Sequence, residues 1–230
     1  MSPAQKSVGL IGGLGPESTI DYYRRLLAEW RRHDPGSAPS LVIDSVDVQY
    51  GLKLLNSDRD ALVDYLLASL QRLAGAGVSF AAITANTPHI VFDKLSPRSP
   101  VPLLSIVEAC AAAAKERGLK RLLLLGTRFT MEAPFYPETF ARLGLTIVTP
   151  DEAERALVHD RYMNQLIPGD FRDSTREEFT AVVAKHRTDG VILGGTEIPI
   201  LFKEATEVAG VPALDTTAIH VAAIVKRLRE

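Results

Sequence analysis

The sequence predicts an α/β fold with two pseudo-symmetric domains, each a parallel sheet flanked by helices. Short apolar runs alternate with segments of helical periodicity, and this order repeats along the chain. The apolar runs are continuous, which is typical of parallel strands covered on both faces. With 230 residues, 46% of them hydrophobic and 23% charged, the chain can bury a large globular core.

Six apolar runs are predicted to be buried strands. They span residues 8–11, 41–46, 80–83, 121–125, 146–148 and 191–193. Segments with a period of 3.6 residues lie between and after them, and helices are therefore predicted over residues 17–32, 60–74, 105–117, 174–185 and 216–229. In the first helix, Ile20, Tyr23 and Trp30 belong to the apolar set.

An internal repeat divides the chain. A strand that ends in glycine opens each half, at Gly12 and Gly126, 114 residues apart. A strand followed by a short polar segment closes each half, at Ala85 and Gly195, 110 residues apart. We expect residues 1–98 and 210–230 to form the first domain and residues 99–209 the second. A proline-rich crossover lies near residues 96–102, and the chain returns near residues 210–212.

Four polar loops follow the predicted strands, at residues 12–19, 84–89, 126–132 and 194–199. Ligands of parallel sheets bind beyond the carboxyl ends of the strands, so we expect these loops to line one active-site cleft between the two domains. Glycines permit close backbone approach, and hydroxyl and amide side chains can bind a carboxylate. The expected substrate-binding residues are Gly13, Ser18, Thr19, Asn86, Thr87, Thr127, Thr130 and Thr196.

Two residues in these loops are candidates for proton transfer. Glu197 can orient an ammonium group or a water, or cap a helix. His89 has an ordinary pKa near neutrality, which suits a general acid or base, but it can equally open the next helix and bond the backbone. Arg128 fits either a second carboxylate of the ligand or a solvated surface position.

Five segments in order resemble the aspartate/glutamate racemase family over nearly the whole chain, and Gly126–Met131 and Asp215–His220 look like a broad-specificity bacterial branch of it. The segments are residues 9–19, 85–89, 126–131, 194–199 and 215–220. The resemblance implies two domains with the active site between them and no pyridoxal phosphate, metal or nucleotide cofactor. It also implies that each polar motif supplies one catalytic cysteine, at the positions held here by Ala85 and Gly195.

Neither Ala85 nor Gly195 can exchange a proton, although a two-base racemase needs a base and an acid on opposite faces of the carbon. Cys110 falls in a predicted helix. One hypothesis is racemisation of an acidic amino acid by substitute groups, in the order Glu197, His89 and Asp47. The alternatives are a decarboxylase, lyase or hydrolase reaction on the same scaffold, or a catalytically silent carboxylate-binding protein.

Charge and composition exclude several other classes of protein. A net charge of −2 gives no basic footprint for nucleic acid or an anionic membrane, and no apolar stretch is long enough to span a bilayer. Residues 1–7 lack the pattern of a signal peptide, and a single cysteine suits a reducing compartment. We therefore expect a cytoplasmic protein, a homodimer, with a small carboxylate or acidic amino acid as its ligand.

Overall fold

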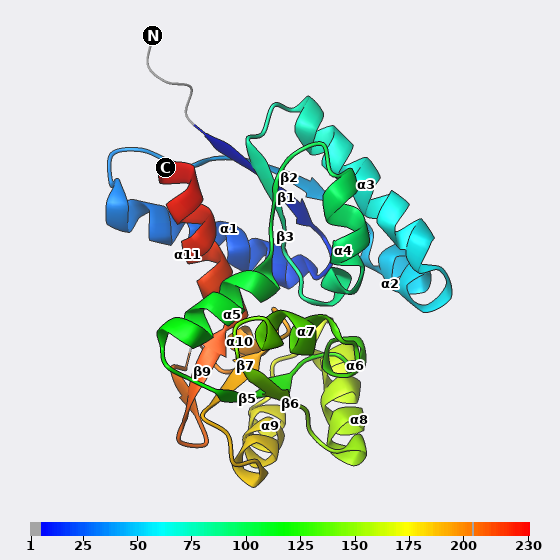
Figure 1. The fold of residues 1–230 in the computed structure, drawn as a ribbon, viewed down its shortest axis with the longest axis vertical. Helices are drawn as coiled ribbons and strands as arrows, with labels where there is room; N and C mark the ends of the chain where they lie inside the picture. The colour runs from blue at the N-terminus through cyan, green and yellow to red at the C-terminus, as the bar shows by residue number, and fades with distance from the viewer. Residues whose placement is uncertain (1–5, 204) are drawn as a thin grey trace. The chain divides into compact units, whose positions relative to one another are not determined.

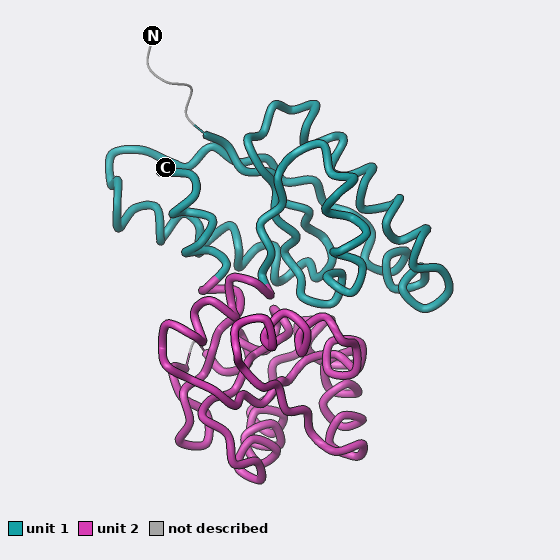
Figure 2. The backbone as a smooth tube through the Cα atoms, viewed as in Figure 1, with its two compact units in different colours: residues 1–106, 220–230 teal, residues 107–219 magenta. Residues whose placement is uncertain are grey.

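The computed structural model describes residues 6–203 and 205–230, and the chain forms two compact units (Figure 2). Unit 1 contains the chain up to Ile106 together with His220–Glu230, and unit 2 contains Val107–Ile219. The domain boundaries predicted at residues 98/99 and 209/210 stay a prediction. Residues 1–5, on which the signal-peptide argument partly rests, lie outside the described residues.

Strands and helices alternate in unit 1 (Figure 1). The elements in order are β1 (Ser7–Gly12), α1 (Pro16–His33), β2 (Ser40–Ser45), α2 (Val48–Ser57), α3 (Arg59–Gly75), β3 (Phe80–Ile83), η1 (Thr87–Val91), α4 (Phe92–Leu95), η2 (Ser96–Arg98) and β4 (Leu103–Leu104). The end of α11 (Thr216–Arg229) also belongs to this unit.

The four strands of unit 1 form a parallel sheet in the order β2-β1-β3-β4. One face carries Val8 and Leu10 of β1 and Phe80 of β3, which pack in one cluster with Tyr22 of α1 and Ile224 of α11. Burial of these side chains anchors both helices to that face of the sheet. The positions of the strand ends, and so of the loops that follow them, are fixed by this core.

Two expectations for unit 1 need correction. Strand β2 was predicted to be buried, but it lies at the edge of the sheet, and Ile43 is 37% exposed. An edge strand has a neighbour on one side only, so an apolar run does not guarantee burial. In α1, Ile20 and Tyr23 are each 44% exposed, whereas Tyr22 is fully buried.

Unit 2 repeats the alternation of strands and helices. Its elements are α5 (Ile106–Glu116), β5 (Arg121–Leu125), α6 (Arg128–Glu132), α7 (Phe135–Ala141), β6 (Thr146–Val148), α8 (Glu152–Arg161), the π-helix η3 (Tyr162–Leu166), α9 (Asp173–Lys185), β7 (Gly190–Leu193), α10 (Ile198–Leu201), β8 (Glu207–Val208) and β9 (Val211–Asp215), followed by the start of α11.

The sheet of unit 2 has the order β6-β5-β7-β9-β8, in which only β8 runs antiparallel to its neighbour. Strands β5, β6, β7 and β9 repeat the order of β1, β2, β3 and β4, so the α/β fold with two largely parallel sheets is confirmed. Leu123, Leu125 and Val191 pack with Val158 of α8 and Phe179 of α9 in one core cluster.

The segment near residues 210–212, where the chain was expected to return to the first domain, leads into strand β9 of unit 2. Pro212 lies in β9, but it pairs only with Glu207 of β8, and the pairing with β7 begins at Ala213. Pro212 interrupts the apolar residues of this strand, so the pattern of continuous apolar runs did not mark it.

Candidate active site

The first loop of unit 1 is held by its own hydroxyl groups. Gly13 has φ +81°, and its N–H donates to Thr19 Oγ1 at 2.9 Å. The hydroxyls of Ser18 and Thr19 donate to the Gly15 carbonyl at 2.9 and 3.1 Å. A side chain at Gly13 would collide with the Val46 backbone, so this tight turn requires glycine.

The second loop of unit 1 follows β3 and lies beside the first. The Thr84 hydroxyl donates to the Ile11 carbonyl at 2.9 Å, and it lies 3.5 Å from the Thr19 hydroxyl. Asn86 is 2% exposed, and Thr87 is partly exposed at the start of η1. The structure therefore brings together the four polar residues predicted from these two loops, Ser18, Thr19, Asn86 and Thr87, at one end of the unit 1 sheet.

His89 lies in η1, 2% exposed, with its ring stacked on Phe92. Its Nδ1 lies 3.1 Å from the Ala85 carbonyl oxygen. A carbonyl only accepts hydrogen bonds, so Nδ1 carries the proton and Nε2 presents a lone pair. That Nε2 atom has no hydrogen-bond partner among the described residues. Burial lowers the pKa of His89 to about 4, so the imidazole is neutral at pH 7.

A second buried imidazole in unit 1 is fully paired. His220 Nε2 donates to the Leu104 carbonyl at 3.1 Å, and its Nδ1 lies 3.0 Å from the Tyr22 hydroxyl, which donates to it. Burial lowers the pKa of His220 to about 3. Of these two buried imidazoles, His89 is the one with a ring nitrogen, Nε2, that has no hydrogen-bond partner among the described residues. Sequence reasoning missed the Tyr22–His220 pair because its members are 198 residues apart.

The third loop follows β5 and carries the first predicted site residues of unit 2. Thr127 caps α6 by accepting a bond from the Thr130 N–H at 3.3 Å, and the two hydroxyl oxygens lie 3.2 Å apart. Both threonines are buried, whereas Arg128 is exposed. A Cβ at Gly126 would lie 2.7 Å from the Gly194 carbonyl oxygen, so the loops after β5 and β7 touch here.

The fourth loop carries a buried acid. Glu197 is 2% exposed and follows β7 at the first turn of α10, but its side chain makes no capping bond to that helix. Its Oε2 accepts a hydrogen bond from the Thr196 hydroxyl at 3.1 Å and another from the Tyr162 hydroxyl. Two hydroxyl donors on one oxygen fit a charged carboxylate. Glu197 thus occupies the N-cap position of α10, while its side chain bonds Thr196 and Tyr162 instead of capping the helix.

Tyr162 was not predicted as part of the site. It begins the π-helix that continues α8, and its ring is 5% exposed in the unit 2 core. Burial and the neighbouring Glu197 raise the pKa of Tyr162 well above its ordinary value, so the phenol keeps its proton. A π-helix often marks a functional position, but nothing in the sequence pattern announced this one.

The remaining candidates lie elsewhere. Asp47 is exposed and caps α2 by accepting bonds from the N–H groups of Gln49 and Tyr50. Cys110 lies fully buried in α5, and burial raises the pKa of its thiol far above the ordinary value. The expected helix position of Cys110 is confirmed. In the described residues, no group of three or more His, Cys, Asp or Glu side chains is placed to hold a metal ion.

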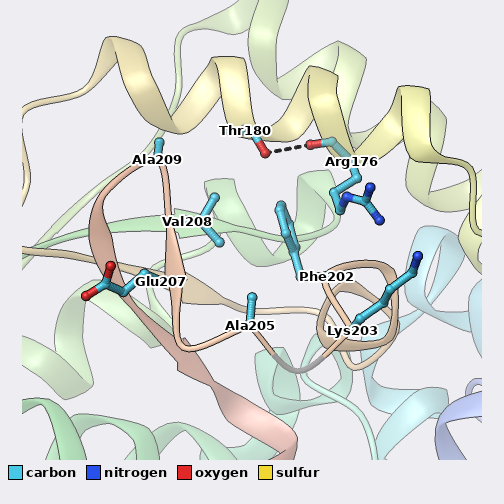
Figure 3. Close-up of a pocket in the computed structure, with 8 residues that line it drawn as sticks. All are labelled: Arg176, Thr180, Phe202, Lys203, Ala205, Glu207, Val208 and Ala209. Carbon is cyan, nitrogen blue, oxygen red and sulfur yellow. Dashed lines mark hydrogen bonds between the residues drawn. The ribbon is translucent and has the colours of Figure 1, made fainter.

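A cavity of about 480 Å³ opens on another part of unit 2 (Figure 3). Arg176 and Thr180 of α9, Lys203 and Glu207 contribute to its wall, and the buried ring of Phe202 points into it. None of its lining residues belongs to the loops after β5 and β7. The cavity is therefore separate from the predicted site residues.

Each unit thus gathers its predicted residues at the ends of its own parallel strands. That the loops of both units line one cleft stays a prediction, as do the binding and catalytic roles of the individual residues. None of the helices formed by residues 6–203 and 205–230 combines the length and apolar character needed to cross a membrane.

Comparison with known proteins gives a consistent result. The sequence pattern of the Asp/Glu/Hydantoin racemases matches residues 11–224. A candidate Asp/Glu racemase from Yersinia pestis has a TM-score of 0.86 and 32% identity, covering 98% of this chain and 100% of that one. An aspartate racemase homologue from Pyrococcus horikoshii OT3 has a TM-score of 0.81 and 32% identity with the same coverage. The broad specificity amino-acid racemase RacX of Bacillus subtilis (strain 168) is 26% identical over 167 residues, which is 70% of this chain and 69% of RacX.

Proposed function

Because this chain belongs to the Asp/Glu/Hydantoin racemase family, we propose that it binds a small acidic amino acid or a related carboxylate and transfers a proton at the carbon beside the carboxylate. In this proposal the protein needs no cofactor, and the two thiols that the family resemblance places at positions 85 and 195 are replaced by other groups. The protein acts as a cytoplasmic homodimer.

The observation that carries this proposal is the buried Glu197 carboxylate after β7, with hydroxyl donors from Thr196 and Tyr162. A buried acid needs such donors to stay charged, and a charged carboxylate can accept a proton from carbon. Glu197 lies two residues after Gly195, so it reaches the end of β7 where the family resemblance puts the second thiol.

His89 supports a different role in the same proposal. Its pKa of about 4 makes the imidazole a weak base at neutral pH, because efficient general bases have pKa values near the working pH. The lone pair on Nε2 is better suited to accept a hydrogen bond from the ligand, for example from an ammonium group. Glu197 is the preferred base because it lies in the loop after β7, two residues after Gly195, and His89 is the second choice.

Carboxylate binding is assigned to Asn86, Thr87 and Thr196, with help from the loop that contains Gly13. The Thr196 hydroxyl has one proton, which it donates to Glu197, so in this proposal Thr196 binds the ligand through its backbone N–H. Asn86 and Thr196 are each 2% exposed, so polar contacts that they make to a ligand are shielded from water. Amide and hydroxyl groups bind a carboxylate without bringing a cation into the site.

Solvent-deuterium exchange tests the proposal. The protein is incubated in D₂O with L- and D-aspartate, L- and D-glutamate and other amino acids, and the α-proton signal is followed by NMR. We expect loss of that signal for at least one acidic amino acid. Absence of exchange with every acidic amino acid would contradict proton transfer.

A second candidate is a decarboxylase, lyase or hydrolase reaction on the same scaffold, or carboxylate binding without a reaction. It is favoured by one observation: the only thiol of the chain, Cys110, is buried in α5 with a raised pKa. A product screen with malonates, hydroxy acids and cyclic amides distinguishes these reactions from racemisation. Turnover confined to amino-acid enantiomers would reject this candidate, and light scattering that gives a monomer mass would reject the homodimer.

A further inference from the structure

The position of Gly195 leaves no room for a side chain. A Cβ built on Gly195 would lie 2.8 Å from both Cζ and the hydroxyl oxygen of Tyr162, and closer still to Cε2 of the same ring. Real Cβ atoms do not come so close to other heavy atoms, so any side chain at 195 requires the ring to move.

The ring of Tyr162 is not free to swing away. It is 5% exposed and packs in the unit 2 core with Leu193, Ile198 and Leu166. Its hydroxyl donates to Glu197, which ties the far end of the side chain to the fourth loop. A displaced ring would break this bond and leave Glu197 with one donor fewer in a buried place.

Tyr162 lies where α8 passes into a π-helix. The N–H of Ile167 donates to the Tyr162 carbonyl at 3.0 Å, an i to i+5 bond that inserts one extra residue into the turn after α8. The extra residue changes the direction of the side chains relative to a continuous α-helix. The ring of Tyr162, at the start of this π-helix, lies against Gly195 across 33 residues of sequence.

We propose that Tyr162 is the positioning residue of Glu197 and that its ring takes the space that a side chain at position 195 would occupy. Gly195 and Tyr162 then depend on each other. Because Gly195 has no side chain, the phenol ring of Tyr162 fits beside it, and the phenol hydroxyl holds the Glu197 carboxylate. This inference deepens the proposed function, on which its catalytic part rests. It explains how the second strand-end motif can work without a thiol.

The packing of Tyr162 against Gly195 is tested by a double-mutant cycle of thermal stabilities. Gly195→Ala should lower Tm by about 4–8 °C in the wild-type background, as expected for overpacking in a chain of this size. Tyr162→Leu lacks the Cε2, Cζ and hydroxyl atoms that meet the new Cβ. In that background the loss caused by Gly195→Ala should shrink to about 2 °C or less. Equal losses in both backgrounds would overturn the inference.

Gly194→Ala is the matched control for this cycle. A Cβ at Gly194 would meet Leu124 and the Leu125 carbonyl and does not meet Tyr162. Its loss of Tm should therefore be the same in the wild-type and Tyr162→Leu backgrounds. A loss that depends on position 162 as strongly as that of Gly195→Ala would mean general softening of the loop, which contradicts the specific contact.

The positioning half is tested by Tyr162→Phe, which keeps the ring and removes the donor to Glu197. We expect the α-proton exchange rate to fall about tenfold at saturating substrate, with the ligand dissociation constant and the native near-UV circular dichroism unchanged. A role in packing alone predicts an unchanged exchange rate. An unchanged rate in a protein that exchanges the α-proton would therefore overturn the positioning role.

A second double-mutant cycle tests the bond between Tyr162 and Glu197 by thermal stability, with no measurement of activity. The Tm change caused by Tyr162→Phe is compared in the wild-type and Glu197→Gln backgrounds, and it should be clearly smaller in the latter because the charged acceptor is gone. Additive changes would overturn the pairing. If no substrate exchanges, the proposed function fails, while the two stability cycles still decide this inference.

Discussion

The loops after β3 and β7 occupy equivalent places in sheets of equivalent strand order, yet they hold different chemistry. Each follows a fully buried strand of four residues, and each begins with small residues around positions 85 and 195. In unit 1 the buried polar group is a neutral imidazole, His89, with an unused acceptor. In unit 2 it is a carboxylate, Glu197, whose Oε2 has two donors. A repeated fold therefore does not make the two halves chemically alike.

The two loops also differ in the space they leave. Ala85 keeps a Cβ at 6% exposure, whereas a Cβ at Gly195 would collide with the ring of Tyr162. Replacing both positions with cysteine would thus have unlike results. Ala85→Cys adds one atom to an existing side chain, but Gly195→Cys needs Tyr162→Leu to make room.

The largest expected effect concerns the histidines of unit 1. The pKa of His89 is lowered from 6.5 to about 4, so the unfolded chain binds a proton in this pH range that the folded chain does not. The free energy of unfolding should therefore fall by roughly 3 kcal/mol as the pH drops from about 7 to 4, since one pKa unit corresponds to about 1.4 kcal/mol. His220, with its pKa lowered to about 3, adds a similar loss that continues to lower pH.

Urea denaturation at pH 7, 6, 5 and 4 checks this prediction. His89→Asn should flatten the dependence of the unfolding free energy on pH, because the buried imidazole is removed. Identical pH dependence in the wild type and His89→Asn would mean that the imidazole is not buried as described.

The next effect compares the two loops directly through catalysis. Glu197→Gln should slow α-proton exchange at least ~100-fold, the usual contribution of a general base. His89→Asn should cost less, because the imidazole is assigned to ligand binding. Glu207→Gln, at an exposed acid of the same unit, is the control and should have no effect. The assignment fails if His89→Asn is the more damaging change.

A smaller effect is expected for carboxylate binding. Asn86→Ala should weaken the binding of aspartate or glutamate by about 1–3 kcal/mol, the cost of leaving a buried polar group unpaired. Isothermal titration calorimetry measures the change, with Tm as the check on folding. Unchanged affinity would remove Asn86 from the binding site.

The smallest effect is expected for the lone thiol. Cys110 is fully buried and its pKa is raised, so iodoacetamide should neither label the native protein nor change its activity. Mass spectrometry of native and urea-unfolded samples measures the labelling. Loss of activity upon labelling, without unfolding, would place Cys110 at the reacting groups.

Sequence patterns predicted the bounds of three strands, one of them at a sheet edge. The predicted bounds 80–83, 121–125 and 146–148 are those of β3, β5 and β6, because continuous apolar runs mark strands in a parallel sheet. Strands β4 and β8 were missed because two residues carry no periodicity. Burial of the edge strands β2 and β6 was overestimated because a run of apolar residues does not reveal an edge.

Sequence patterns predicted only those site residues that directly follow a strand. Glu197, Asn86 and His89 follow strands, so the strand-end rule found them. Tyr162 lies in a helical segment and meets Gly195 only through tertiary packing, so no local pattern identifies it. The bond from Nδ1 of His89 to Ala85, which leaves Nε2 open, likewise depends on side-chain orientation and not on spacing.

The central claim, that Glu197 transfers the proton at a site whose two thiol positions hold Ala85 and Gly195, is tested most directly by measuring α-proton exchange separately for the L- and D-enantiomers of one acidic amino acid. The account predicts that both enantiomers exchange at unequal rates, and that Glu197→Gln slows one of them far more than the other. Equal slowing of both enantiomers, or exchange that Glu197→Gln leaves intact, would contradict it.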